Sequence, residues 1–317
     1  MKLSKIPVQY IKTTDIRELR YFWWRLTDEG RAPNAPPEPT HPSEYRKLLN
    51  EYLSKQNETD DGKAKKIVKE LTDDFEAYHL TNEQLDWIDP KDIRLCYWVW
   101  SYLRHSVEKL DENRSPIEQK LPYAIPGEWL NSDEQMIYDT LGLNFNPKNH
   151  KSRHENVICF FDYWNASNHK KVAFIEELER LWESTVLPDD LSWINKEDKE
   201  ITDWFIRYIK DSELPTQWIP ELNSSDEPYH RCIAIIDFYW CFEDPRAKKY
   251  FIGKLKKAWY QQKHRAKMQN EAQKAYNFVM GTEIDGFLTA LARKAKIPKN
   301  RFLEQLITKE YEKKFTD

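Results

Sequence analysis

The segment HENVICFFDYWNASNHKKVAFIEELERLW (residues 154–182) returns later in the chain as HRCIAIIDFYWCFEDPRAKKYFIGKLKKAW (residues 230–259). Both copies begin with His and share a Tyr-Trp pair. After a one-residue insertion they also share Phe-Ile, at 174–175 and 251–252. Each copy predicts a buried helix, a tight turn and an amphipathic helix that ends in Trp. Because such units bury apolar faces that one copy cannot bury alone, we expect residues 81–270 to form a duplicated helical-repeat or bundle domain that ends in a basic helix.

Three further segments share one beginning: Trp-Ile-Asp at 87–89, Trp-Leu-Asn at 129–131 and Trp-Ile-Asn at 193–195. An acidic residue follows each Asp or Asn three places later. Asp and Asn accept hydrogen bonds from the exposed amides of a helix start, and an acid in the first turn favours the same end. The pattern predicts that these Asp and Asn residues cap helices at about 90–110, 132–142 and 196–210.

The composition favours a mainly helical protein. The chain has 317 residues, of which 40% are hydrophobic and only 7 are Gly. It has no glycine-rich phosphate loop of the GxGxxG or GxxxxGK[ST] type. We expect residues 1–80 to be an N-terminal helical region, with an aromatic cluster at 21–24, a proline-rich loop at 33–42 and helical periodicity again over 43–80.

Several functional classes lack their sequence signals. No apolar run reaches about 18 residues, and the N-terminus lacks the apolar centre of a signal peptide, so we expect no membrane association. The four cysteines lie in apolar segments without CxxC spacing, which predicts buried free thiols in a reducing cytoplasm rather than a zinc site: Cys96, Cys159, Cys232 and Cys241. We expect no metal and no other cofactor.

Catalytic motifs are also missing: the chain contains no HExxH, GxSxG or DxDxDG sequence. His154 and His230 stand at equivalent places in the two copies, where a packed or capping histidine is the favoured interpretation. Asp162 and Asp237 precede aromatic residues, and such acids would suit a nuclease. However, the repeat preserves the neighbouring Tyr and Trp more closely, which favours packing. We therefore predict that the protein is not an enzyme.

Charge is distributed unevenly along the chain. Residues 246–317 contain 18 Lys and Arg against 7 Asp and Glu, a net charge of +11. The remainder holds 31 basic and 46 acidic residues, a net charge of −15. This asymmetry points to a polyanionic partner for the C-terminal part, although a solvated lysine-rich surface would give the same bias. The acidic remainder is expected to offer a surface to a protein partner.

The second copy also reverses the charge of one helix. Residues 176–180 of the first copy read Glu-Glu-Leu-Glu-Arg, and the matching residues 253–257 read Gly-Lys-Leu-Lys-Lys. The basic run continues through Lys263, Arg265 and Lys267. Acidic residues serve solubility at least as well as basic ones, so solubility does not explain the change.

The last residues predict a strand followed by two helices. In KAYNFVMGTEID (274–285), side chains of a strand over 277–281 would alternate between two faces. Thr282 is expected to cap a helix with the apolar face Ile284, Phe287, Leu288, Leu291 and Ala292. Asn300 is expected to cap a second, with Phe302, Leu303, Leu306, Ile307 and Tyr311 facing inward. A lone strand leaves its backbone unpaired and two short helices enclose too little core, so this unit requires a second copy. The alternative is that 277–281 is only an edge strand or loop.

ALARKAKIPKNRFLEQLI (290–307) resembles the helix–turn–helix core of the ribbon-helix-helix family of DNA-binding proteins. Lys296 and Pro298 stand where that family usually has Gly and often Ser, and Lys enters the left-handed conformation at modest cost. The resemblance implies a homodimer of 271–317 whose paired strands enter the major groove. It also implies phosphate binding by the amides at 300–302. With the basic helix, the implied DNA-binding residues are Asn277, Val279, Gly281, Lys274, Lys256, Lys257, Lys263, Arg265, Lys267, Lys299, Asn300 and Arg301.

Over residues 229–315 the order of elements is similar to that of the bacterial MatP family, which organises the terminus region of the chromosome. The likeness lies in Asp244-Pro245, the basic helix 254–267, the strand and the two helices. It implies a palindromic double-stranded DNA site and a place on the nucleoid in the bacterial cytoplasm. The large acidic N-terminal part has no counterpart there, and little follows the last helix where that family has a coiled coil. We therefore expect sequence-specific DNA binding in chromosome organisation or transcriptional regulation. The alternative is a helical-repeat interaction scaffold with a basic docking surface.

Overall fold

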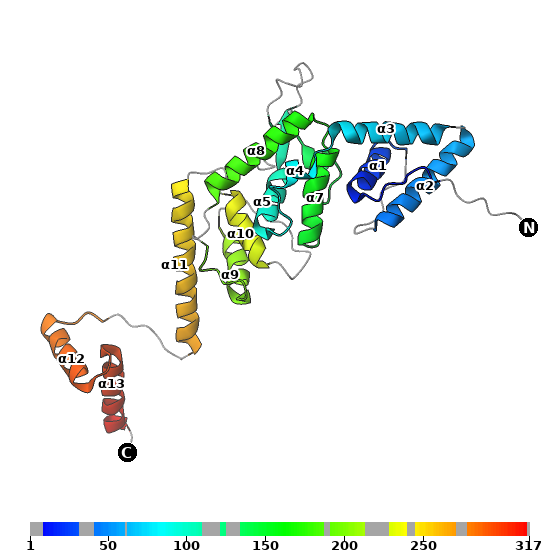
Figure 1. Ribbon diagram of the computed structural model, residues 1–317. Helices are drawn as coiled ribbons and strands as arrows, with labels where there is room; N and C mark the ends of the chain where they lie inside the picture. The colour runs from blue at the N-terminus through cyan, green and yellow to red at the C-terminus, as the bar shows by residue number, and fades with distance from the viewer. Residues whose placement is uncertain are drawn as a thin grey trace, which may run out of the picture. The chain divides into compact units, whose positions relative to one another are not determined.

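A computed structural model describes residues 9–31, 41–60, 62–109, 121–124, 134–186, 191–212, 228–239, 245–270 and 278–315. This part contains thirteen helices and three short strands, so the prediction of a mainly helical protein is confirmed (Figure 1). The chain divides into two compact units, Met1–Trp259 and Tyr260–Asp317, which we call the N-terminal and C-terminal units. In the described residues, no helix is both long and apolar enough to cross a membrane.

The N-terminal unit is built on a row of five helices. Helix α1 (Ile16–Asp28) packs on α7 (His150–Tyr163), and α7 packs on α5 (Ile93–Arg104). On its other side α5 packs on α10 (Pro228–Tyr239), which in turn packs on α9 (Lys199–Lys210). As the middle helix, α5 is buried along its whole length from Leu95 to Leu103. Helices distant in sequence therefore alternate in space.

Two helices cover α1 at one end of this row. Helices α2 (Pro42–Thr59) and α3 (Lys63–Tyr78) both pack on α1, and their apolar stripes form one core with it. The polar break between them contains Gly62, whose φ of 85° lies in the left-handed region that glycine tolerates. The predicted return of helical periodicity over 43–80 is confirmed. The short helix α4 (Asn82–Leu85) then leads to α5.

A small antiparallel sheet follows α5. Its strands are β1 (Ser106–Lys109), β2 (Tyr123–Ala124) and β3 (Glu134–Met136), in the order β2-β1-β3. The expected helices 90–110 and 132–142 were therefore wrong in part. The first helix stops at Arg104, and the second is only the four-residue α6 (Ile137–Thr140). Val107 is fully buried and pairs with Tyr123 and Met136, so contacts distant in sequence override the helical pattern.

The predicted helix starts fall at the right segments but three residues too early. The N-cap of α5 is Asp92, which accepts a hydrogen bond from the Leu95 amide, and Asp89 instead accepts one from the Lys91 amide. In the same way α9 is capped by Asp198, while Asn195 accepts from the Glu197 amide. The expected caps therefore form a turn that precedes each helix. The third segment, at 129–131, lies outside the described residues.

Each copy of the repeat ends in a long outer helix: α8 (Asn168–Thr185) in the first and α11 (Pro245–Asn270) in the second. The helix pairs α7–α8 and α10–α11 match the prediction from the repeat, and the second turn lies outside the described residues. Three of the four cysteines are described, and all three are buried free thiols as predicted: Cys96, Cys159 and Cys232. In the C-terminal unit, α12 (Thr282–Ala295) and α13 (Lys299–Phe315) form a helix pair.

Candidate nucleic-acid interface

The turn between α12 and α13 has the backbone geometry expected from the sequence. Lys296 closes α12 in the left-handed conformation, with φ 57° and ψ 34°. Among the described residues it is the single non-glycine residue with a positive φ. The amides of Lys296 and Ile297 donate to carbonyls in the last turn of α12, at Arg293 and Ala292. Lysine thus occupies a position that glycine usually takes at a helix end.

The expected caps of this helix pair were wrong, by one residue for α12 and by two residues for α13. Gly281, not Thr282, is the N-cap of α12, and it supplies no side-chain hydrogen bond. Helix α13 begins at Lys299, so Asn300 lies inside its first turn. Proline accounts for the second difference, because Pro298 is suited to a helix start, where its missing N–H costs no hydrogen bond. Its carbonyl accepts from the Phe302 amide and opens the helix.

The predicted phosphate-binding cations lie at the start of α13 and face solvent. The Lys299 ammonium is 2.6 Å from the Asp285 carboxylate, and the Arg301 guanidinium is 3.6 Å from Glu304. Both pairs are about half exposed or more, and such surface pairs contribute little to stability. Exchange of either carboxylate for a phosphate would therefore cost little.

The apolar faces of α12 and α13 are mostly exposed in the single chain. Only Leu288 and Ala292 are buried between the helices. In one chain the apolar set does not all face inward, because two short helices cannot enclose so many side chains. The exposed set is Ile284 (52%), Phe287 (55%), Leu291 (46%), Leu306 (51%), Ile307 (60%), Tyr311 (62%) and Phe315 (73%).

The segment before α12 is also exposed. Residues 278–280 form neither helix nor strand in the single chain, and Gly281 has an extended backbone, with φ −59° and ψ 148°. Val279 is fully exposed, while Phe278 and Met280 are 63% and 39% exposed. Asn277 and Lys274 lie outside the described residues. The predicted strand needs a partner strand to form, and it stays a prediction.

The basic helix α11 is continuous from residue 245 to 270. It contains nine Lys and Arg and no Asp or Glu. Lys256 and Lys257 are exposed in the N-terminal unit, and Lys263, Arg265 and Lys267 are exposed in the C-terminal unit. A polyanion could reach these cations without any change in the packing of the helix.

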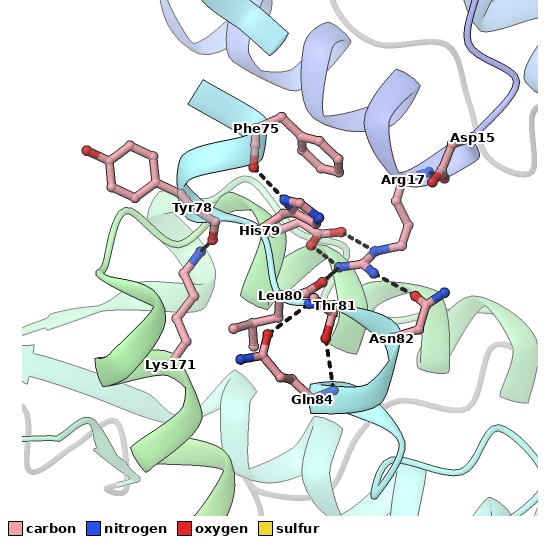
Figure 2. Close-up of polar contacts among 11 residues, drawn as sticks. Asp15, Arg17, Phe75, Tyr78, His79, Leu80, Thr81, Asn82, Gln84 and Lys171 are labelled. Carbon is pink, nitrogen blue, oxygen red and sulfur yellow. Dashed lines mark hydrogen bonds and ion pairs between the residues drawn. The ribbon is translucent and has the colours of Figure 1, made fainter. Parts of the chain in front are cut away.

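Buried ion pairs are the feature that the sequence reading missed. The Arg17 guanidinium at the start of α1 donates two hydrogen bonds to the Asp162 carboxylate near the end of α7, with N–O distances of 3.0 and 2.6 Å. Arg17 also donates to the carbonyl of Leu80 and to the side chain of Asn82 (Figure 2). Arg94 at the start of α5 holds Asp237 of α10 in the same two-bond geometry, at 2.7 and 3.0 Å.

A buried lysine accompanies each of these pairs. Lys171 donates to the carbonyl of Tyr78, the last residue of α3, at 2.7 Å (Figure 2). Lys248 donates to the carbonyl of Thr185, the last residue of α8, at 2.6 Å and lies 3.4 Å from Asp237. Burial lowers the pKa of Lys171 to about 8, and the nearby Asp162 carboxylate opposes that shift. The two copies thus use an arginine, an aspartate and a lysine in the same way, each set joining its own group of helices.

A short motif could have revealed this arrangement. Asp-Ile-Arg occurs at 15–17 and again at 92–94, each time as a helix cap followed by the first two helical residues. The arginine that grips the buried aspartate is the last residue of both motifs. Asp162 and Asp237 are each at most 3% exposed and bound by arginine, so their place in packing explains them. Among the described residues no group of three or more His, Cys, Asp and Glu could hold a metal ion.

No protein-family model, curated protein or solved structure matches this chain. Its function is therefore inferred from its own residues.

Proposed function

We propose that this protein binds double-stranded DNA sequence-specifically as a homodimer, with 277–281 of two chains paired as a ribbon in the major groove and the basic helix α11 on the DNA backbone. The observation that carries the proposal is the open apolar face of α12 and α13. Soluble proteins seldom leave a contiguous apolar patch of this extent uncovered unless it is an interaction site.

A second copy of the same unit is the occupant that fits this face best. The exposed segment 278–280 directly precedes α12, so two chains can pair these segments antiparallel while their helices close one core behind the strands. Pairing would satisfy the strand backbone, and association of four helices would enclose Phe287, Leu291, Leu306 and Ile307. Dimerisation would thus pair the strand backbone and bury the exposed apolar side chains at the same time.

The paired strands would read DNA through the side chains that leave the core. On the expected alternation, Asn277 would hydrogen-bond a base edge and Val279 would contact a thymine methyl, whereas Gly281 has no side chain with which to read sequence. The amides at the start of α13 would bind a phosphate, with Lys299 and Arg301 beside it. Phosphate contacts of this kind would fix the position of the protein along the DNA, and the base contacts of the strands would give the preference for sequence.

On this proposal the protein acts in chromosome organisation or transcriptional regulation on a palindromic site in the bacterial nucleoid. It requires no cofactor or metal and is not an enzyme. The acidic N-terminal unit would serve the dimer as a scaffold and as the surface for a protein partner.

A second candidate function is a helical-repeat interaction scaffold with a basic docking surface. The row α1–α7–α5–α10–α9 favours it, because stacked repeats often offer long binding surfaces. On that view α11 would dock an acidic protein instead of DNA. Both candidates predict salt-sensitive binding, but only the first predicts preference among DNA sequences.

A selection from random duplexes followed by gel-shift titration tests the proposal. We expect one palindrome to be enriched and its affinity to fall steeply as salt rises, because phosphate contacts release counterions. We also expect the preference over random duplex to persist, and sedimentation to show a dimer without DNA. Equal and weak binding of selected and random duplexes would favour the scaffold instead.

A further inference from the structure

Helices α8 and α11 are two copies of one element, so each serves as an internal control for the other. Their inward faces carry the same residues at matching positions and are buried or partly buried in both. The matching pairs are Lys171 and Lys248, Phe174 and Phe251, Ile175 and Ile252, Leu178 and Leu255, and Trp182 and Trp259. Packing against the row of helices has therefore kept this face unchanged after duplication.

The outward faces differ at nearly every position. We define the α11 outer face as Lys249, Tyr250, Gly253, Lys254 and Lys257, which are all exposed in the N-terminal unit. Their counterparts on α8 are Val172, Ala173, Glu176, Glu177 and Arg180, of which Glu176 and Arg180 are exposed and the other three are partly buried. The three lysines give the α11 outer face a charge of +3, whereas its counterpart, with two Glu and one Arg, carries −1. Gly253 and Lys257 differ from Glu176 and Arg180 at positions that are exposed in both helices, so packing in the described part of the chain does not account for these two differences.

Gly253 is the most informative residue of this face. Glycine inside a helix is less favourable than any residue except proline, and the matching position on α8 has Glu176. Among the described residues, nothing lies within 4 Å of a Cβ atom added at Gly253, so no contact in that part of the chain requires glycine there. Glycine at such a position is expected where another molecule approaches the helix backbone closely.

Tyr250 stands one turn before Gly253 and is 70% exposed, where the first copy has Ala173. The Lys254 ammonium lies 5.6 Å from the centre of the Tyr250 ring, a distance that permits a cation–π contact. The Tyr250 ring thereby holds the Lys254 ammonium beside the exposed backbone of Gly253, and the Tyr250 hydroxyl is a further hydrogen-bond donor. Lysine and tyrosine donors around a bare helix surface suit phosphate oxygens.

We propose that the N-terminal unit makes its own contact with the DNA sugar-phosphate backbone through the α11 outer face. Lys249, Lys254 and Lys257 pair with phosphates, the Tyr250 hydroxyl donates to one, and the strand lies against Gly253. This rests on the proposed DNA binding and assigns part of it to a unit separate from the ribbon. An acidic protein is the less favoured occupant, because a smooth backbone of evenly spaced anions needs no matching side-chain pockets.

The substitution Gly253→Leu tests this contact in the full-length dimer. It adds a side chain into open solvent at a position where leucine favours the helix, so the unfolding midpoint should rise by about 2–4 °C. Affinity for the selected palindrome and for random duplex should nevertheless both fall, on the order of tenfold. The ratio of the two affinities should not change, because the contact reads no bases. Glu176→Leu at the matching position of α8 is the control and should leave both affinities unaltered.

The salt dependence provides a second readout. Lys254→Ala and Lys257→Ala should each reduce the slope of log affinity against log salt by about 0.9, whereas Gly253→Leu should leave the slope nearly unchanged. If wild-type protein binds DNA and Gly253→Leu binds as tightly, this contact does not exist although the proposed function stands. If wild-type protein binds no DNA and an acidic polypeptide such as polyglutamate binds instead, both proposals fail.

Discussion

The charge of Asp237 should be essential to the stability of the N-terminal unit. Asp237 is fully buried, and two cations converge on it: Arg94 through two hydrogen bonds and Lys248 at 3.4 Å. Asp237→Asn keeps the shape of the side chain but leaves both cations without their counter-charge. Breaking a buried pair in this way costs about 3–5 kcal/mol. In a unit of this size, 1 kcal/mol corresponds to roughly 2–4 °C, so we expect the unfolding midpoint to fall by about 6–20 °C.

Tryptophan fluorescence is the appropriate assay, because all 13 Trp residues lie before residue 260 and report on the N-terminal unit alone. Asp203→Asn, at an exposed position on α9, is the matched control and should change stability by less than about 0.5 kcal/mol. Adding Lys248→Met to Asp237→Asn should restore part of the lost stability, because it removes one of the two buried cations that the Asp237 carboxylate neutralised. The electrostatic reasoning is refuted if the double variant is no more stable than Asp237→Asn.

Three other outcomes follow from the same contacts. Leu291→Glu should raise the dimer dissociation constant roughly 100-fold in sedimentation, from lost apolar burial, while Ala290→Glu on the same helix should not; equal effects of both would remove Leu291 from the interface. Asn277→Ala should reduce preference for the palindrome over random duplex, whereas Lys257→Ala should weaken both alike; a uniform loss in the Asn277 variant would contradict its place in the groove. Burial lowers the pKa of Lys171 to about 8, so below that pH the folded state carries a disfavoured charge. Between pH 8 and 10.5 the unfolded chain binds the extra proton, and wild-type stability should therefore rise with pH relative to Lys171→Met, by up to about 3 kcal/mol; parallel stability curves would argue against a buried, depressed lysine.

Patterns among residues close in sequence predicted most of the long helices of the N-terminal unit. Helical periodicity placed α2, α3 and the helices of both copies, and polar breaks placed their ends, because these features depend on residues close in sequence. Strand β1 could not be found in this way. Val107 follows a helix without a break, and its strand forms only because Tyr123 and Met136 arrive from later in the chain. The helix caps at Asp92 and Asp198 were missed because an earlier Asp or Asn matched the same pattern.

In the C-terminal unit the sequence predicted the left-handed turn at Lys296, but not which apolar side chains of α12 and α13 are exposed in a single chain. Periodicity showed that Phe287 and Leu291 share one helix face with Leu288. It could not show which of them a single chain buries, since that depends on how much surface the second helix covers. Only the innermost residues, Leu288 and Ala292, are covered in one chain. The apolar pattern of such a unit describes the associated form, not the isolated one.

In the part of the chain that the structure describes, the row of helices ends at α9, and a comparison of α5 with α9 explains why. Aligned from their capping residues Asp92 and Asp198, α5 and α9 keep their tryptophans in register at Trp98 and Trp204. The differences fall where α5 is covered and α9 is exposed: in α9, Glu200, Asp203 and Arg207 replace Arg94, Tyr97 and Ser101. With Glu200 in place of an arginine, α9 cannot donate hydrogen bonds to a buried aspartate as Arg17 of α1 and Arg94 of α5 do. A further helix that brought a carboxylate to this position would meet Glu200 instead of an arginine, so α9 ends the row instead of extending it.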